Sequence, residues 1–258
     1  MKIVVLVKEV PDTYGDRVLD LETGLADRGA SESVLDEIGE RALEVALSYA
    51  DKDPDAEVVV LSMSPGSSAT NVRKGLAMGA GSAVHIVDEG LLGADLGLTS
   101  EVLAAALQRV GFDLVITGNQ STDGGAGVLP SWLAELLDVP AATALAKVEI
   151  SGSGVTGTRG SDDAAMTVSV PLPCVISITE ALPDARFPNF KGIMAAKKKR
   201  FETLSLADLG IDPMDPCAAR SIVIGLSLKP PREAGVKIMD EGDAGEKLAQ
   251  FLIENRLA

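Results

Sequence analysis

The sequence has few of the side chains on which most catalytic and metal sites depend. Its 258 residues include two cysteines, Cys174 and Cys217, and a single histidine, His85. Two cysteines suggest no disulfide framework and no metal site. His85 lies in a strand-like run, residues 82–87, where a structural role is favoured over a catalytic one. The sequence therefore predicts no Ser–His–Asp set and no metal cluster.

Long apolar runs and basic character are also missing. No stretch is apolar over the length needed to span a bilayer, and Met1 leads directly into a strand rather than a signal peptide. These two features predict a cytoplasmic protein. The net charge of −15 argues against nucleic acid as the main partner, because a negative protein is repelled by a phosphate backbone.

Strand-like and helical patterns alternate through the first half of the chain. Apolar runs of strand type are followed by segments with helical spacing, and Ser33 stands where it could cap the first helix, with Asp36 three residues later. The expected strands cover 2–8, 57–63, 82–87 and 113–117, and the expected helices cover 33–50, 69–78, 98–110 and 128–137. This alternation implies right-handed βαβ crossovers, and it predicts an α/β fold with a parallel sheet.

The most informative stretch is a loop of small residues between the fourth strand and the helix that follows. Residues 118–127 include four glycines, which let the backbone approach a phosphate closely. The next helix begins near Val128, with Pro130 in its first turn, and its free N–H groups attract anions. No lysine lies in the loop, so we expect amides and hydroxyls to hold any phosphate. An ordinary βα loop without a ligand is the alternative.

Two other loops are expected at the same edge of the sheet. Residues 9–12 follow the first strand without a G-x-G-x-x-G turn, and residues 64–68 follow the second. Ligands of parallel sheets bind outside the carboxyl ends of the strands. A purine or ribose near these two loops, with a phosphate near 118–127, is therefore a reasonable arrangement.

The pattern changes after Pro140. Short alternating strands at 144–150, 155–160 and 165–170 predict an antiparallel meander, and residues 174–179 return to the main sheet. Near the end of the chain we expect a helical turn at 204–209, a strand at 222–226, an extended linker at 229–232 and an amphipathic helix at 244–258, with apolar Leu248, Phe251, Leu252 and Leu257. That helix packs either on another subunit or back onto its own domain.

Residues 180–200 have an unusual composition. Phe187, Phe190 and Ile193 are flanked by prolines and a glycine, and a basic run follows at 197–200. An exposed loop with an aromatic anchor and a basic shoulder would suit docking on an acidic partner. A solvated basic helix with a phenylalanine beneath it is the alternative.

The chain resembles, essentially from end to end, the β subunit of electron transfer flavoprotein. The stretches that carry the resemblance are VLVKEVPD at 5–12, VLDEIGERALEVAL at 34–47, RKGLAMGA at 73–80, DLVITGNQSTDG at 113–124, ARFPNFKGIMAAKKKR at 185–200 and PPREAGVK at 230–237. The run at 185–200 is highly specific to this family.

The resemblance implies a function as an electron carrier rather than an enzyme. Members of the family have a Rossmann-like fold, similar to adenine nucleotide α-hydrolases, and the β subunit pairs with an α subunit. The pair takes electrons from flavin dehydrogenases, usually acyl-CoA dehydrogenases, and passes them to a quinone oxidoreductase at the membrane. FAD is held mainly by the α subunit, while the β subunit holds an AMP without redox role.

The resemblance also implies which residues bind AMP. The phosphate would lie against the backbone of 127–129, where better-known members have polar side chains and this chain has Gly, Val and Leu. The implied AMP contacts are Leu6, Ser33, Val34, Leu35, Asp36, Met63, Gly118, Asn119, Gln120, Ser121, Thr122, Asp123, Gly124, Gly125, Ala126, Gly127, Val128 and Leu129. Tyr14 and Leu35 would lie where the β subunit approaches the flavin ring.

A second set of residues is implied for docking the dehydrogenase. In the family an apolar residue at the tip of a recognition loop, usually leucine, anchors in a pocket of the partner, and Phe190 stands at that position. The implied docking residues are Arg186, Phe187, Phe190, Ile193, Lys197, Lys198 and Lys199. The resulting domain plan is a nucleotide-binding domain over 1–228, including the recognition loop at 183–200, and a linker and helix over 229–258 that pack on the α subunit.

Two further interpretations remain at this point. A bifurcating relative would hold a second FAD in the AMP pocket and oxidise NADH. A stand-alone module that binds or cleaves ATP would have a similar topology, but the Ser-Gly-Gly type of loop after the first strand is missing here.

Overall fold

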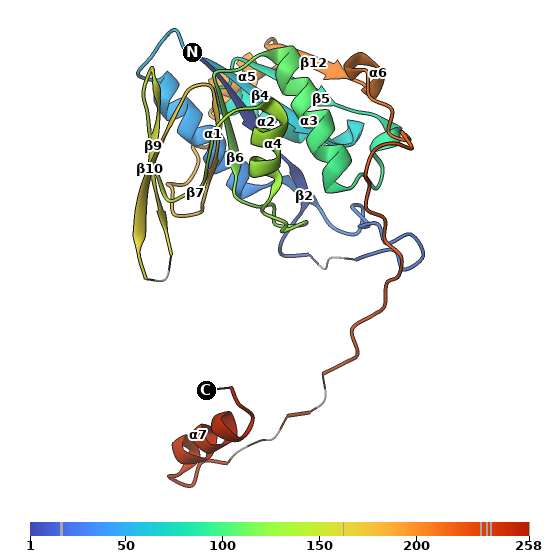
Figure 1. Cartoon of the computed structure of the whole chain (residues 1–258), viewed down its shortest axis with the longest axis vertical. Helices are drawn as coiled ribbons and strands as arrows, with labels where there is room; N and C mark the ends of the chain where they lie inside the picture. The colour runs from blue at the N-terminus through green and yellow to red at the C-terminus, as the bar shows by residue number, and fades with distance from the viewer. Residues whose placement is uncertain (16–17, 162, 233, 236, 238, 258) are drawn as a thin grey trace. The chain divides into compact units, whose positions relative to one another are not determined.

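A seven-stranded parallel sheet forms the centre of the computed structural model (Figure 1). The structure describes residues 1–15, 18–161, 163–232, 234–235, 237 and 239–257. Neighbouring strands pair in parallel throughout the sheet, as the alternating pattern predicted. In order across the sheet the strands are β12 (Arg200–Leu204), β5 (Ser82–Ile86), β4 (Glu57–Met63), β1 (Lys2–Leu6), β6 (Leu114–Gly118), β11 (Cys174–Ile178) and β7 (Ala141–Leu145). The α/β Rossmann-like fold class is thereby confirmed.

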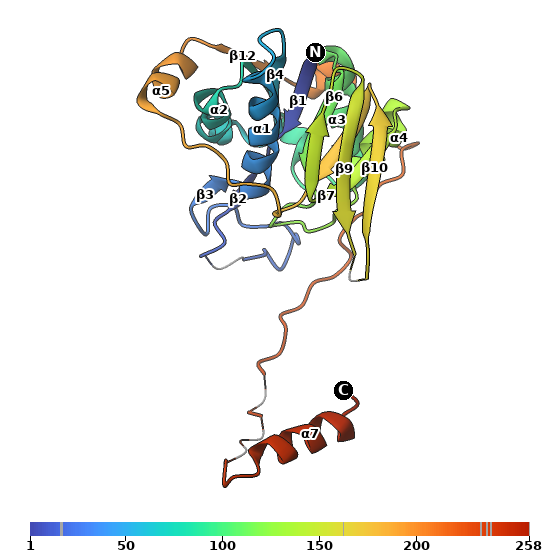
Figure 2. The same ribbon diagram turned by 90° about the vertical axis from the view of Figure 1, so that its left-hand side faces the viewer.

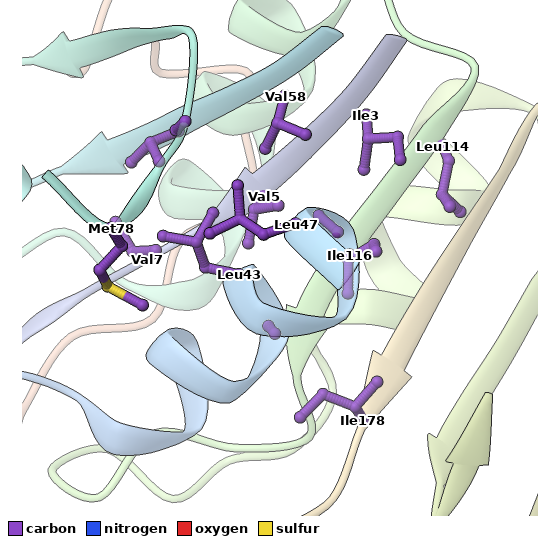
Figure 3. Close-up of a cluster of buried hydrophobic side chains, with 14 of the residues drawn as sticks. Ile3, Val5, Val7, Leu43, Leu47, Val58, Met78, Leu114, Ile116 and Ile178 are labelled. Atoms are coloured by element: carbon purple, nitrogen blue, oxygen red, sulfur yellow. The ribbon is translucent and has the colours of Figure 1, made fainter. Parts of the chain in front are cut away.

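Helices cover both faces of this sheet (Figure 2). On one face lie α1 (Glu37–Ala50) and α2 (Ala69–Met78), and on the other lie α3 (Leu96–Val110) and α4 (Leu129–Leu137). Because successive side chains of a strand point to opposite faces, Ile3 and Val5 of β1 join the α1 side, whereas Val4 and Leu6 join the α3 side. Figure 3 shows the α1 side, where Leu43 and Leu47 pack against the strands.

The first helix begins later than the capping pattern predicted. Ser33–Leu35 form a short strand, β3, which pairs with β2 (Glu9–Pro11), and α1 starts only after Asp36. The Asp36 N–H donates to the Lys8 carbonyl oxygen at 2.8 Å. The helix predicted from Ser33 was therefore wrong over residues 33–36, because strand pairing takes up these backbone groups.

Two strands of the main sheet were not predicted. β7 lies beside β11, and its alanine-rich sequence has a low preference for strands. The single strand predicted over 144–150 therefore covers the end of β7 and the whole of β8 (Lys147–Ile150). β12 pairs with β5 directly after the lysine run. The local sequence there is typical of a basic surface. The pairing of β12 depends on β5, which lies more than 100 residues earlier in the chain.

The antiparallel meander was predicted correctly. β8 pairs with β9 (Gly154–Gly160), and β9 pairs with β10 (Ala165–Pro171) in a separate three-stranded sheet. β11 then returns to the parallel sheet beside β6. The short elements η1 (Gly66–Ser68), η2 (Glu89–Leu91) and α6 (Leu206–Leu209) occupy connections at the sheet.

The end of the chain forms a unit of its own. The chain divides into Met1–Ile224 and Gly225–Ala258, and the second unit contains α7 (Ala244–Glu254). Residues 222–226, predicted as a strand, form none, and the Ile224 side chain is 94% exposed. Residues 233 and 236 of the 230–237 motif, and Ala258, lie outside the described residues. Within the described part of the chain, none of the helices has the length and hydropathy needed to cross a bilayer.

A glycine controls how closely α5 (Phe190–Ala196) approaches α2. A Cβ atom at Gly192 would lie 2.2 Å from the carbonyl oxygen of Ala77, which belongs to backbone and cannot rotate away. At Gly152, by contrast, a Cβ atom would meet nothing within 4 Å.

We therefore expect Gly192→Ala to lower the free energy of unfolding by about 1–3 kcal/mol, as other overpacked contacts do. Gly152→Ala is the matched control and should change it by less than about 0.5 kcal/mol. Urea unfolding of the two variants tests this, and equal midpoints would show that α5 is not held against α2.

Candidate functional site

The carboxyl ends of β1 and β6 mark the place where this fold binds ligands. The two strands are neighbours, and β1 connects through α1 to β4 on one side while the chain returns through α3 to β6 on the other. At such a change of direction the connecting helices diverge and leave a crevice. Lys8 follows β1, and residues 118–128 follow β6, so both reach the crevice.

The loop between β6 and α4 presents its backbone to solvent. Residues 124–128 are exposed, and Gly125 and Gly127 have φ angles of 61° and 67°, which other residues rarely adopt. No side-chain hydrogen bond caps α4, so its first N–H groups have no such partner within the described chain. Exposed amides at the start of a helix are groups to which an anion can bind.

Lys8 supplies the positive side chain that the loop itself lacks. Its Nζ lies 2.7 Å from Asp123 Oδ1 and 3.4 Å from Ser121 Oγ. Arg28 Nη2 lies 3.2 Å from the other oxygen of Asp123. The expectation that amides and hydroxyls would hold any phosphate stays a prediction, and the structure adds a lysine, directly after β1, that lies against the loop after β6. A cation directly after a buried first strand is the signal that would have revealed it.

Asp123 is ionised because of these neighbours. Burial by itself would raise the pKa of this carboxyl group, but the hydrogen bond and charge of Lys8, with donors from Ser121 and Gly124, lower it to about 2. One carboxylate thus pairs with both Lys8 and Arg28 beside the exposed amides.

Asp36 fastens the loop to the beginning of α1. Its Oδ2 accepts a hydrogen bond from the Thr122 N–H at 2.9 Å, and only 2% of the residue is exposed. The second oxygen, Oδ1, is buried and accepts no well-formed hydrogen bond from the described residues. Burial raises the pKa of the Asp36 carboxyl group in spite of hydrogen bonds from Thr122 and from the backbone N–H of Ile38. A carboxyl group at the wall of a cavity can accept a hydrogen bond from a hydroxyl or amino group of a ligand.

A cavity of about 200 Å³ lies between the start of α1 and this loop. Its walls come from α1, from the first half of the loop and from the chain after β11. The lining residues are Asp36, Glu37, Ile38, Arg41, Asn119, Gln120, Ser121, Thr122 and Glu180. Four residues implied by the resemblance at 119–122 therefore share a cavity with Asp36, whereas Gly124–Val128 lie outside its lining.

The loops after β1 and β4 also meet, as their position at one sheet edge predicted. Glu9 accepts hydrogen bonds from Ser68 Oγ at 2.7 Å and from Asn71 Nδ2 at 2.6 Å. His85 of β5 is buried, and it is paired with Ser62 of the neighbouring strand β4. Its Nε2 lies 2.9 Å from Ser64 Oγ. Burial lowers the pKa of His85, which favours a neutral side chain at neutral pH.

Other residues implied by the resemblance lie around this edge with their side chains directed elsewhere. Leu6 and Leu35 are buried in the two hydrophobic clusters, so only their backbone is available to a ligand. The Ser33 carbonyl oxygen accepts from Asn71, and Met63 ends β4. Tyr14, expected near a flavin, is completely exposed in this chain.

The segment at 183–200 exposes its aromatic side chains. Phe187 and Phe190 are 90% and 78% exposed, and Ile193 and Met194 are exposed beside them. Lys197 and Lys198 are also exposed. The alternative with a phenylalanine tucked under a basic helix was wrong, since both aromatic rings face solvent. We refer to residues 183–200 as the docking segment.

Two of the expected docking residues have partners inside the folded chain. Arg186 donates to both Glu44 oxygens at 2.8 Å and to Asp51 Oδ2 at 2.8 Å. Lys199 Nζ donates to the carbonyl oxygens of Leu76 and Ala80, at the end of α2. Their charged groups therefore stabilise the fold of the segment.

Comparison with known proteins gives a consistent family. Residues 23–209 match the electron transfer flavoprotein domain. The chain is 43% identical over 262 residues to the electron transfer flavoprotein subunit beta of Mycobacterium tuberculosis, covering 99% of this chain and 98% of that protein. It is 31% identical over 242 residues to the corresponding subunit of Bacillus subtilis, covering 93% of each.

A third relative has a more specific name. The chain is 33% identical over 238 residues to the caffeyl-CoA reductase-Etf complex subunit CarD of Acetobacterium woodii, covering 91% of this chain and 90% of that protein. The family therefore includes proteins from different complexes. The domain match and the full-length relatives show that this chain belongs to the electron transfer flavoprotein family, among its β subunits.

Proposed function

We propose that this chain pairs with an electron transfer flavoprotein α subunit, binds AMP at the carboxyl edge of its sheet and docks a flavin dehydrogenase through residues 183–200. The proposal depends on two surfaces that occur in the same chain. Exposed loop amides lie beside Lys8, and exposed aromatic rings lie on a separate segment. FAD, held mainly by the α subunit, supplies the redox chemistry. The β subunit binds and positions.

The residues at the edge of the sheet fit a mononucleotide. The amides of 124–129, together with Lys8 and Arg28, suit a phosphate group, and the Asp36 carboxyl group at the wall of the cavity suits a hydroxyl group of the ribose or the amino group of the base. Polar and charged residues, with Ile38, line the 200 Å³ cavity beside them. AMP takes no part in electron transfer in this proposal.

The docking segment fits a partner with an apolar pocket and acidic surroundings. Phe190 would enter the pocket, and Lys197 and Lys198 would face the acidic groups. An acyl-CoA dehydrogenase as donor and a membrane quinone oxidoreductase as acceptor follow from the family resemblance. A dehydrogenase of another substrate class is compatible with the same surface.

The number of flavins separates this function from its closest alternative. Purification with the α subunit should give one FAD and one AMP per heterodimer. Two FAD and no AMP would instead indicate a bifurcating protein, in which the same edge of the sheet holds the second flavin and NADH is the reductant.

Gly127→Asp should expel AMP, because it places a carboxylate against the amides that would receive the phosphate. Gly127 has a φ of 67°, a conformation that Asp and Asn adopt more readily than other residues with side chains. Like charges about 4 Å apart near a protein surface repel by several kcal/mol, so occupancy should fall by about tenfold or more. AMP released by denaturation of the purified heterodimer is the measurement.

Gly127→Asn is the matched control for that experiment. It has nearly the same shape and backbone preference but no charge, so it should retain most of the AMP. Normal AMP content in Gly127→Asp would place the phosphate elsewhere, and equal loss in both variants would indicate that side-chain bulk decides occupancy.

Phe190→Ala should weaken docking of the dehydrogenase without changing the bound cofactors. A fully desolvated aromatic anchor is worth about 2 kcal/mol or more at an interface, so the KM for the reduced dehydrogenase should rise about thirtyfold. Leu92→Ala, which removes another exposed apolar side chain outside the segment, is the control and should leave the KM unchanged. Unaltered kinetics in Phe190→Ala would exclude Phe190 as the anchor.

A further inference from the structure

The part of the docking segment that carries Phe187 has no regular structure of its own. Residues 183–189 form neither helix nor strand, and Phe187 is among the most exposed large apolar residues of the described chain. A segment of this kind would sample many conformations unless contacts outside it hold its backbone. The relevant question is which contacts hold it.

Helix α1 supplies them from one of its faces. Arg41 Nη1 donates to the carbonyl oxygen of Leu182, and its Nη2 pairs with Asp184. Three residues further along, Glu44 accepts from the backbone N–H of Arg186 at 3.0 Å as well as from the Arg186 side chain. Asp51, two turns later, pairs with the same guanidinium group. Residues 41, 44 and 51 recur at helical spacing and so face the segment together.

These contacts differ from ordinary surface ion pairs in two ways. Arg41 binds a main-chain group of Leu182, directly before the segment, and Glu44 binds one of Arg186 within it, so the backbone is fixed on both sides of residues 183–185. Arg186 holds Glu44 through two parallel hydrogen bonds of 2.8 Å, the arrangement in which arginine binds a carboxylate with defined geometry. The pKa of Glu44 is lowered: its burial acts in the opposite direction, but the Arg186 hydrogen bonds outweigh it.

The far end of the segment is held by α2. The Asn189 side chain caps α5 by accepting from the Gly192 N–H at 2.8 Å, and Gly192 packs against Ala77. Lys199 Nζ binds the carbonyl oxygens at the end of α2 at 2.9 and 2.7 Å. The exposed side chains of Phe187 and Phe190 thus lie between two fixed ends.

We propose that Arg41 is a positioning residue for docking: it fixes the base of the segment on α1, with Arg186 as a second tie, so that Phe187 and Phe190 are presented to the partner in one arrangement. This inference rests on the docking function proposed above. Arg41 touches no partner in it and acts only through the segment. Preorganisation of this kind reduces the conformational freedom lost on binding.

The test is the kinetics of electron transfer from the dehydrogenase with the complete heterodimer. Arg41→Met should raise the KM for the dehydrogenase by about fivefold and leave kcat unchanged, because a loosened segment weakens association. Arg41→Lys, which can still donate to Leu182 and pair with Asp184, should restore most of the affinity. Arg109→Met removes a guanidinium group that likewise contacts one carbonyl oxygen and one carboxylate, and should have no effect.

A double variant separates a positioning role from general destabilisation. If Arg41 acts through the exposed aromatic ring, Arg41→Met should raise the KM much less in a Phe190→Ala background than in the wild-type chain. Hydrogen exchange at residues 182–190 should accelerate in Arg41→Met, and AMP and FAD contents are measured on the same preparation. Because Arg41 also lines the nucleotide cavity, the AMP content identifies any effect that arises there.

Each outcome decides between the two proposals. If Phe190→Ala alone leaves the KM unchanged, the docking function itself is wrong. If Phe190→Ala raises the KM but Arg41→Met does not, or if the two effects multiply fully in the double variant, the positioning role is overturned. Loss of AMP in Arg41→Met without faster exchange at 182–190 would also overturn it.

Discussion

The hydrogen bond between the Thr122 N–H and the buried Asp36 carboxylate is the contact on which the arrangement of the site depends. It joins the glycine-rich loop to the start of α1, and that helix also holds the base of the docking segment through Arg41 and Glu44. A carboxylate is buried only where donors compensate the lost hydration. The position of Asp36 is therefore strongly determined. The glycine-rich loop and the docking segment are both held by contacts with α1 and the residue before it.

Local patterns in the sequence were sufficient for five of the seven strands of the main sheet and for the edge where their loops meet, but they did not reveal the charged pairs at that edge. The apolar runs and the glycine-rich loop predicted the strands and the edge at which their loops meet. Lys8 was missed because its contact with Asp123 joins residues 115 positions apart, and periodicity carries no information on such a pair. The same reason applies to Arg41 and Leu182, which are 141 positions apart.

Burial, rather than composition, distinguishes the roles of neighbouring basic residues. Lys197, Lys198 and Lys199 are identical in type, yet the first two face solvent while the third binds carbonyl oxygens at the end of α2. The carboxyl end of a helix carries unpaired carbonyl groups and a partial negative charge, so a lysine beside it stabilises the fold. Burial lowers the pKa of Lys199. A run of like charges in a sequence therefore does not by itself describe a binding surface.

The chemistry available to this chain agrees with a subunit that binds and positions. Its only histidine is buried against Ser64, and burial lowers its pKa, so it is poorly placed to exchange protons with a substrate. Beside the loop after β6, Lys8 and Arg28 both pair with Asp123, at 2.7 and 3.2 Å. Among the described residues, the groups exposed to a ligand or a partner include the main-chain amides of 124–128, the side chains of Lys8 and Arg28 beside them, and the aromatic rings of Phe187 and Phe190. These groups can form contacts with a ligand or a partner, which agrees with a subunit of the electron transfer flavoprotein family.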